Sequence, residues 1–240
     1  YHLANFEKVS IDWRTRWLPG KNWQLELTAS SQEVEFDKSE LGLTDAASHR
    51  AGANLSYSGG EKYQAWAWLA WDRSDRDQTG RDFSGGIEKP ANRNVLPLPQ
   101  GSDPTRDYTV GQDTAAISAG IGMSIRLSEK LSLGTEYMGL DTSEENNVRT
   151  FSARDLVGGD LPAIEHRLHR VEAKLDWQVR DSLTLSAQHT WYRYKENDYA
   201  WSNLGIGDIA KVLTGGQNPP NEVVNMFSIA VRYTPEGKWK

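Results

Sequence analysis

Histidine is the side chain of this sequence best suited to bind haem iron or a transition metal, and the chain contains five of them. His166 and His169 are three residues apart, and in a strand this spacing places two side chains on opposite faces. His2 and His49 are isolated in the sequence, and His189 falls on the face of a strand that we expect to be apolar. The histidines therefore predict no haem ligand and no metal centre within this chain.

Carboxylates are the second group that could carry chemistry. Asp and Glu number 33 against 27 Lys and Arg, and the formal net charge is -6. Many of them fall within residues 74–111 and 141–165, where they could bind Ca²⁺, but no EF-hand spacing is present. Calcium in these loops is a minor expectation beside ordinary solvated charge, and the acidic balance gives no basic surface for nucleic acid. Ser, His and Asp occur together only as scattered residues, so a hydrolase is a weak alternative and we expect no enzymatic activity.

No cysteine is present, which excludes disulfides, thiolate metal sites and covalent haem attachment through a C-x-x-C-H motif. Apolar residues make up 38% of the chain, below the usual share for a globular protein, yet ten Trp and nine Tyr need a surface to pack against. No run approaches the roughly 20 apolar residues of a membrane helix. A β-barrel in a membrane suits this composition, because only one face of each strand must be apolar and its loops can be very polar.

The elements that must position these residues are strands, since apolar and polar residues alternate with a period of two in about nine segments. The expected bounds are 7–17, 23–36, 49–57, 63–73, 114–127, 131–140, 166–179, 183–194 and 223–233. The segment 63–73 is aromatic on both faces, with Trp66 and Trp68 opposed to Tyr63 and Trp71, so its pattern does not assign its faces. Each of the other segments predicts one apolar face and one small, polar or charged face.

The connections between these strands alternate in length. Tight turns follow the first, third, fifth and seventh strands, and long polar loops at about 37–48, 74–111, 141–165 and 195–222 follow the others. Short periplasmic turns and long extracellular loops are typical of bacterial outer-membrane barrels, whereas a soluble sandwich has no reason to keep this order. We therefore predict an all-β protein, a transmembrane antiparallel up-and-down β-barrel in the bacterial outer membrane.

The parity of the strands predicts the direction of the chain. The last strand follows a long loop, so it ends in the periplasm, and by the same count the first strand begins outside. A single-chain barrel normally has an even number of strands, and about nine are visible here. We therefore expect residues 1–240 to form one β-barrel domain that lacks its N-terminal part, as the C-terminal portion of a larger barrel.

In such a barrel the apolar face of each strand contacts lipid and the other face lines the lumen. The tryptophans expected in aromatic girdles at the membrane interfaces are Trp13, Trp17, Trp23, Trp177 and Trp191. The residues predicted to face lipid are Ile117, Ile121, Ile125, Leu175, Trp177, Leu183, Leu185, Phe227, Ile229, Val231 and Tyr233. The residues predicted to face the lumen are Asp12, Arg14, Arg16, Glu26, Ser118, Gly120, Gly122, Ser124, Arg126, Glu136, Arg170, Glu172, Lys174, Asp176 and Arg232.

Several stretches, most of them in the C-terminal third, carry a resemblance to a known family. They are LPAIEHRLHR at 161–170, RDSL at 180–183, YRYKENDYAW at 192–201, VLTGGQ at 212–217 and FSIAVRY at 227–233, with DWRTR at 12–16 and AWDR at 70–73 as weaker matches. Together they resemble the MtrB/PioB family, the decahaem-associated outer-membrane barrels of porin–cytochrome electron conduits. That family usually stops at an aromatic residue near this point, whereas here residues 234–240 follow Tyr233.

The resemblance implies a protein that does no chemistry itself. It would sheathe and position a multihaem c-type cytochrome, in the lumen or at its periplasmic side, for electron transfer across the outer membrane, as in extracellular electron transfer or metal oxidation and reduction. Haem c would be carried by that partner, and an extracellular multihaem cytochrome is a further expected partner. The lumen-facing residues are then candidate cytochrome contacts: small ones such as Gly120 let a partner approach, and charged ones such as Arg170 offer polar contacts.

Other interpretations of the same residues remain open. A wet barrel wall with cross-strand charge pairs accounts equally well for the small and charged side chains. A general diffusion porin for small solutes would use the same barrel with an open lumen. A soluble carbohydrate-binding β-sandwich would use its exposed tryptophans to stack on sugars, but it leaves the alternation of turn and loop lengths unexplained.

Overall fold

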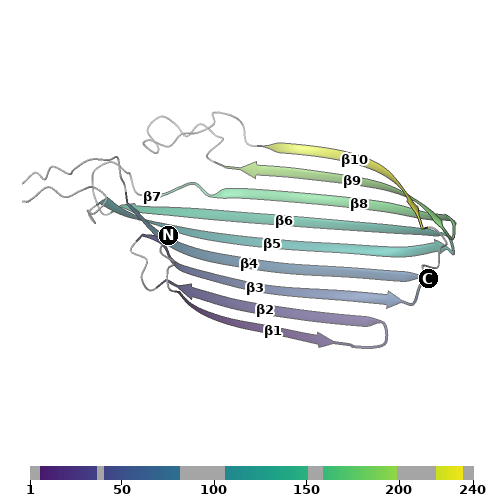
Figure 1. Cartoon of the computed structure of the whole chain (residues 1–240), viewed down its shortest axis with the longest axis horizontal. Helices are drawn as coiled ribbons and strands as arrows, with labels where there is room; N and C mark the ends of the chain where they lie inside the picture. Colours follow the sequence, from purple (N-terminus) through teal and green to yellow (C-terminus); the bar gives the residue numbers. More distant parts are fainter. Residues whose placement is uncertain (1–5, 37–40, 82–105, 151–158, 199–219, 235–240) are drawn as a thin grey trace, which may run out of the picture.

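Strands account for almost all of the chain that the computed structural model describes, which is residues 6–36, 41–81, 106–150, 159–198 and 220–234. They form one antiparallel sheet (Figure 1). The strands are β1 Glu7–Trp17, β2 Trp23–Glu35, β3 Gly42–Gly59, β4 Tyr63–Arg81, β5 Asp107–Ser128, β6 Leu131–Thr150, β7 Gly159–Asp160, β8 Ile164–Arg180, β9 Leu183–Asn197 and β10 Asn221–Tyr233. Within these residues, no helix is long and apolar enough to span a membrane.

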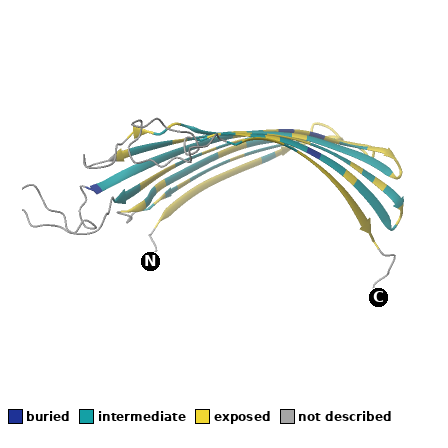
Figure 2. Cartoon of the chain, turned by 90° about the horizontal axis from the view of Figure 1, so that it is seen from above, coloured by how far each residue is buried: buried dark blue, intermediate teal, exposed yellow. Residues whose placement is uncertain are grey.

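Each long strand pairs with the next long strand along the chain. The order across the sheet is β1-β2-β3-β4-β5-β6-β8-β9-β10, and the two-residue strand β7 pairs with β6 beside this path. β1 and β10 lie at the two edges, and among the described strands each has one neighbour, so the sheet is not closed. Seen from above, the sheet is bowed (Figure 2). The predicted all-β, antiparallel, up-and-down fold is confirmed.

The short connections all lie at one end of the sheet, which we call the turn end. They are residues 18–22, 60–62, 129–130 and 181–182, as the sequence predicts. Gly60 has a φ of 71°, a conformation that favours glycine, and it closes the tight turn between β3 and β4. The longer connections meet the other end, the loop end, and most of their residues lie outside the described ranges.

For the longest predicted loop, 74–111, the predicted positions of both ends are wrong. β4 continues to Arg81 and β5 begins at Asp107, and the two strands stay paired over this whole length. Here most side chains on both faces are polar, so the period-two contrast that reveals a strand is weak although the backbone hydrogen bonds continue. The sequence pattern therefore marks where the apolar side chains stop and not where the strand stops.

Two other predicted loops are shortened for the same reason. β3 begins at Gly42, inside the loop predicted at 37–48, and the loop predicted at 141–165 loses its first ten residues to β6. The last predicted loop, 195–222, differs by a few residues at each end.

The register separates the side chains of the whole sheet into two faces. In every ladder between long strands odd-numbered residues pair with odd-numbered residues and even with even, apart from irregularities near three strand ends. Leu25 pairs with Leu55, for example, and Leu55 with Ala67. We call the odd-numbered side the apolar face and the even-numbered side the polar face.

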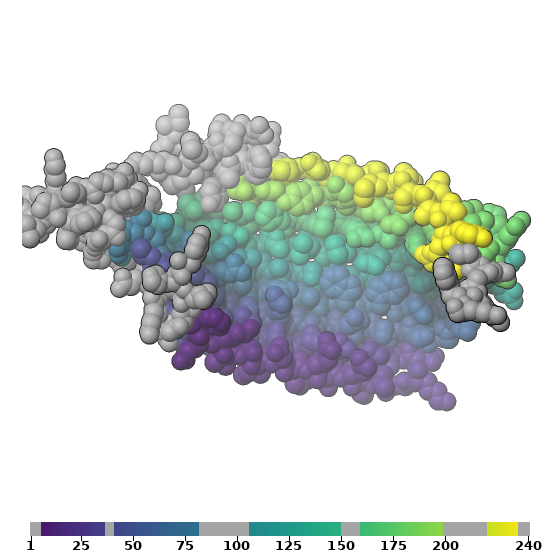
Figure 3. All heavy atoms as spheres, viewed as in Figure 1, coloured from purple at the N-terminus to yellow at the C-terminus, as the bar shows by residue number. Residues whose placement is uncertain are grey.

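No second layer of protein covers either face in the described part of the chain. That part has no buried hydrophobic residue, and Figure 3 shows the strands packed side by side from β1 to β10. Large apolar side chains stand in the open, and Ile229 is 84% exposed. A β-sandwich would bury such a face against a second sheet, whereas an outer-membrane barrel leaves it to lipid.

Candidate functional site: the polar wall and the apolar belt

All the residues predicted to face the lumen lie on the polar face, and all those predicted to face lipid lie on the apolar face. The register therefore brings together, on one wall, side chains from β1, β2, β5, β6, β8 and β10. The list of lumen-facing residues omits β3, β4 and β9, which contribute Arg50, Trp66, Trp68 and Tyr194 to the polar face. Contact of either face with lipid or with a partner remains a prediction.

An apolar belt occupies the half of the apolar face next to the turn end. It comprises Val9, Ile11, Trp13 and Trp17 on β1; Trp23, Leu25, Leu27 and Ala29 on β2; Ala51, Ala53, Leu55 and Tyr57 on β3; Tyr63, Ala65, Ala67, Leu69 and Trp71 on β4; Ile117, Ala119, Ile121, Met123 and Ile125 on β5; Leu131, Leu133 and Tyr137 on β6; Val171, Ala173, Leu175 and Trp177 on β8; Leu183, Leu185, Ala187 and Trp191 on β9; and Phe227, Ile229, Val231 and Tyr233 on β10.

Aromatic rings mark both edges of this belt. On β4 Tyr63 lies at the turn-side edge and Trp71 at the loop-side edge, and a separation of eight residues in a strand corresponds to roughly 26 Å. On the last strands Trp177 and Tyr233 lie at the turn side, and Trp191 at the loop side. Outer-membrane barrels carry an apolar band about 25 Å tall between two aromatic girdles, so the belt has the expected height and edges.

The belt runs obliquely across the sheet. Its centre on β1 is Trp13, and the register leads from there to Ile117 on β5. Its midpoint on β10 is Ala230, and the register leads from there to Arg126 on β5, nine residues away from Ile117. The belt therefore shifts by nine residues over the eight steps from β1 to β10, or about one residue at each step. With ~3.3 Å per residue along a strand and ~4.8 Å between strands, this shift corresponds to a tilt of the strands of roughly 40°. Strands of outer-membrane barrels tilt by a similar angle.

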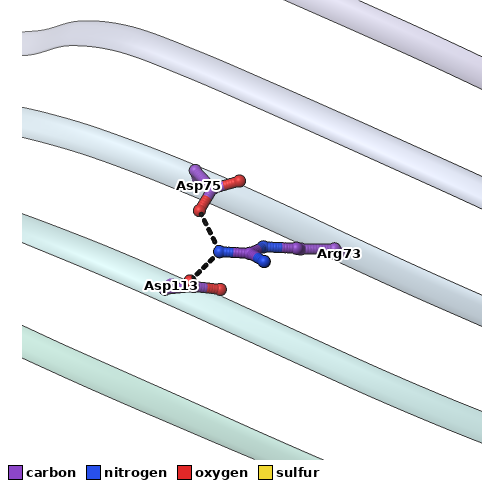
Figure 4. Close-up of polar contacts among 3 residues, drawn as sticks. All are labelled: Arg73, Asp75 and Asp113. Carbon is purple, nitrogen blue, oxygen red and sulfur yellow. Dashed lines mark hydrogen bonds and ion pairs between the residues drawn. The ribbon is translucent and has the colours of Figure 1, made fainter.

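Beyond the belt, toward the loop end, the apolar face becomes charged. The Arg73 Nη2 atom lies 3.5 Å from Asp75 Oδ1 and 2.5 Å from Asp113 Oδ2 (Figure 4), and the two carboxylates raise the pKa of Arg73. Arg167 likewise lies 3.1 Å from Asp141. In this part of the sheet both faces carry solvated charge, so it does not belong in a lipid environment.

Two tryptophans cover the small residues in the middle of the polar face. Trp66 pairs with Gly122 and Trp68 with Gly120, and both glycines are buried. A Cβ atom at Gly120 would lie 2.5 Å from Nε1 of Trp68, and one at Gly122 would clash with Trp66 in the same way. The expectation that these glycines leave room for a partner is therefore wrong: the room is filled by indole rings from the neighbouring strand.

Most charges of the polar face are paired within the wall. Across strands, Glu26 lies 3.6 Å from Arg14 and 3.3 Å from Arg16. Along β8, Arg170 pairs with Glu172, and Lys174 lies 3.0 Å from Asp176. Arg126 is also paired and lies 2.7 Å from Glu61. Three other charged residues predicted to face the lumen form no ion pair in the described part of the chain: Asp12, Glu136 and Arg232. Exposed pairs of this kind stabilise a fold by less than about 1 kcal/mol each, so their main effect is to reduce the local charge of the wall.

A polar cluster lies on the same face at the loop end, beyond the belt. The Tyr194 hydroxyl donates a hydrogen bond to Glu196 Oε2 at 2.7 Å, so it accepts one from Nδ1 of His166 at 2.9 Å. Burial, followed by the neighbouring Glu196 carboxylate, raises the pKa of Tyr194 to about 12. His169 lies on the opposite face, as its spacing predicts, where its ring contacts the Tyr137 hydroxyl at 2.9 Å. Among the described residues, no group of three or more His, Asp and Glu side chains could hold a metal ion.

Comparison with known proteins gives a consistent result. The model of the outer membrane beta-barrel porin family MtrB/PioB matches residues 1–234. The outer membrane protein MtrB of Shewanella baltica (strain OS185) is 21% identical over 233 residues, which cover 97% of this chain and 30% of that protein. Among solved structures, the copper transporter OprC matches with a TM-score of 0.63 and 12% sequence identity, and the match covers 96% of this chain and 34% of OprC. The ferric yersiniabactin uptake receptor FyuA of Yersinia pestis matches with a TM-score of 0.55 and 9% sequence identity, and the match covers 94% of this chain and 34% of FyuA. These solved structures show a shared fold, and the chain spans about a third of each relative's length.

Proposed function

The chain belongs to the MtrB/PioB family of outer-membrane β-barrel porins, and we propose that it forms part of a barrel that sheathes a multihaem c-type cytochrome for electron transfer across the outer membrane. In this proposal the apolar belt faces lipid and the polar face lines the lumen. The cytochrome carries the haem, and this chain supplies wall and no chemistry of its own. A second multihaem cytochrome would dock outside, at the loop end.

The observation that carries the proposal is a polar wall with mostly paired charges, in a chain similar to MtrB over 97% of its length. A pore that selects small ions by charge needs unpaired side chains that point into the lumen. A wall that encloses another protein needs charges that are already paired, because a partner that packs against an unpaired charge removes water from it, and this desolvation is unfavourable. The indole rings of Trp66 and Trp68 add apolar area that a packed partner would cover.

Co-purification tests the proposal directly. The full-length protein is extracted from outer membranes in mild detergent, isolated through an affinity tag and stained for covalently bound haem. We expect a haem-staining polypeptide in a fixed ratio to the barrel. A barrel that purifies without haem and conducts ions through an open lumen in planar bilayers would overturn the proposal and indicate a general diffusion porin.

Site-directed cross-linking tests which face the cytochrome touches. The chain has no cysteine, so an introduced one is unique within it. Ser118→Cys places a thiol on the polar face and Ile117→Cys places one at the neighbouring position on the apolar face. With a short thiol-to-amine cross-linker, we expect Ser118→Cys to capture the cytochrome and Ile117→Cys to capture none. Equal capture by the two variants would contradict the assignment of the polar face to the lumen.

A further inference from the structure

We propose that Arg193 and Lys195 bind the phosphate of a lipid headgroup in the outer leaflet of the membrane. Both lie on the apolar face of β9, two and four residues beyond Trp191, which ends the belt on this strand. Both side chains are exposed, and in the described part of the chain neither has a carboxylate within ion-pair distance. The proposal rests on the proposed placement of the belt in lipid, with the loop end outside.

The other basic side chains next to the loop-side edge of the belt are already neutralised. Arg73 contacts two aspartates, and Arg167 lies 3.1 Å from Asp141 and 3.7 Å from Glu165. Arg193 and Lys195 have different cross-strand neighbours. Arg193 lies between His169 and Val223, and Lys195 lies between Arg167 and Asn221. None of these four neighbours is acidic. In a chain of net charge -6, this pair is a local positive surface that is complementary to an anion.

The depth of the pair selects a lipid as the source of that anion. Trp191 lies at the edge of the belt, where aromatic rings sit at the headgroup level. At ~3.3 Å per residue, Arg193 and Lys195 follow at roughly 7 and 13 Å along the strand, so flexible side chains from both positions reach the headgroup layer. A guanidinium binds two phosphate oxygens at once, and a neighbouring ammonium adds a second charge.

An apolar groove gives the same lipid a place for an acyl chain. The groove has a volume of about 490 Å³ on the apolar face, and the small side chains of Ala65 and Ala67 contribute to its lining. One end of it is formed by Tyr137 and Val171. Val171 pairs directly with Trp191, so this end of the groove lies about two residues, or ~7 Å, along the strands from Arg193, the nearer of the two cations. Phosphate and hydrocarbon sites are therefore adjacent, as a single lipid molecule requires.

The test measures lipid A binding to the delipidated full-length barrel by native mass spectrometry. The variant is Arg193→Gln with Lys195→Gln, and the matched control is Lys21→Gln with Lys130→Gln, which removes two exposed charges at the turn end. At about 1 kcal/mol per basic residue near an anionic surface, we expect roughly 30-fold weaker binding in the variant and none of this loss in the control. Wild-type protein should also bind lipid A much more tightly than its dephosphorylated form.

Three results would overturn this proposal: equal binding by variant and wild type, equal loss in the control, or indifference to the phosphates. Loss of a protein partner from the variant, with lipid binding unchanged, would assign the pair to a protein interface instead. If the double variant does not assemble, each single substitution is expected to weaken binding about fivefold. Haem staining of the same samples separates this test from the proposed function, because the cytochrome should remain bound in every variant.

Discussion

The two halves of the sheet share a backbone arrangement and differ in their side chains. In the turn-side half one face is apolar and the other polar, whereas in the loop-side half both faces are mostly polar. β4 and β5 pass through both halves with unbroken pairing, from Tyr63 and Ile125 to Arg81 and Asp107. The hydrogen-bonded ladder therefore does not depend on the apolar face. What the apolar face decides is which part of the barrel wall can lie in lipid, and the loop-side half is expected to project beyond the membrane.

The strongest way to break this comparison is to put a charge into the belt. We compare the substitutions Leu133→Arg and Ser143→Arg. Leu133 lies within the belt on β6, and Ser143 lies on the same face of this strand but beyond the belt, opposite Glu165. We expect Leu133→Arg to destabilise the barrel by about 2–4 kcal/mol and Ser143→Arg by about 0–1 kcal/mol, because lipid solvates the first site and water the second. Urea unfolding of the full-length protein in lipid vesicles measures both. Equal losses would contradict the proposed membrane boundary.

A smaller effect is expected from the packed centre of the polar face. Gly120→Ala places a methyl group against the Trp68 ring, and overpacking of this kind costs about 1–3 kcal/mol. Gly134→Ala is the control, since a Cβ there meets no atom closer than 4.0 Å. The second variant Gly120→Ala with Trp68→Ala should recover part of the loss in urea unfolding. If Gly120→Ala is as mild as the control, the indole does not lie on the glycine.

The smallest effect is expected from the charges of the loop-side half. Arg73→Gln removes the ion pairs to Asp75 and Asp113, and because these groups are exposed we expect only a slight loss of stability, smaller than that of Gly120→Ala. Salt screens such pairs, so the difference from wild type should vanish in about 1 M NaCl. Arg73→Lys should retain most of the stability. A loss as large as that of Gly120→Ala, persisting in high salt, would mean that charge pairing, and not the backbone ladder, holds this half together.

The sequence by itself predicts the faces of most strands. Side chains alternate along any strand, so the contrast between Ile117 and Ser118, or between Phe227 and Ser228, assigns them to opposite faces without knowledge of their neighbours. The family follows from short local stretches in the same way. These inferences are local, and the register of the sheet agrees with them in every predicted lipid-facing and lumen-facing residue.

Only the tertiary structure decides what happens between strands. The register places Trp68 over Gly120, pairs Glu26 with two arginines of β1, and continues β4 to Arg81 where no alternation marks a strand. It also gives the oblique course of the belt, and it separates Arg73, which forms two ion pairs, from Arg193, which forms none within the described part of the chain. Each of these depends on which residues of distant segments lie opposite one another. Periodicity along one strand carries no information about that, because register is fixed by hydrogen bonds between strands.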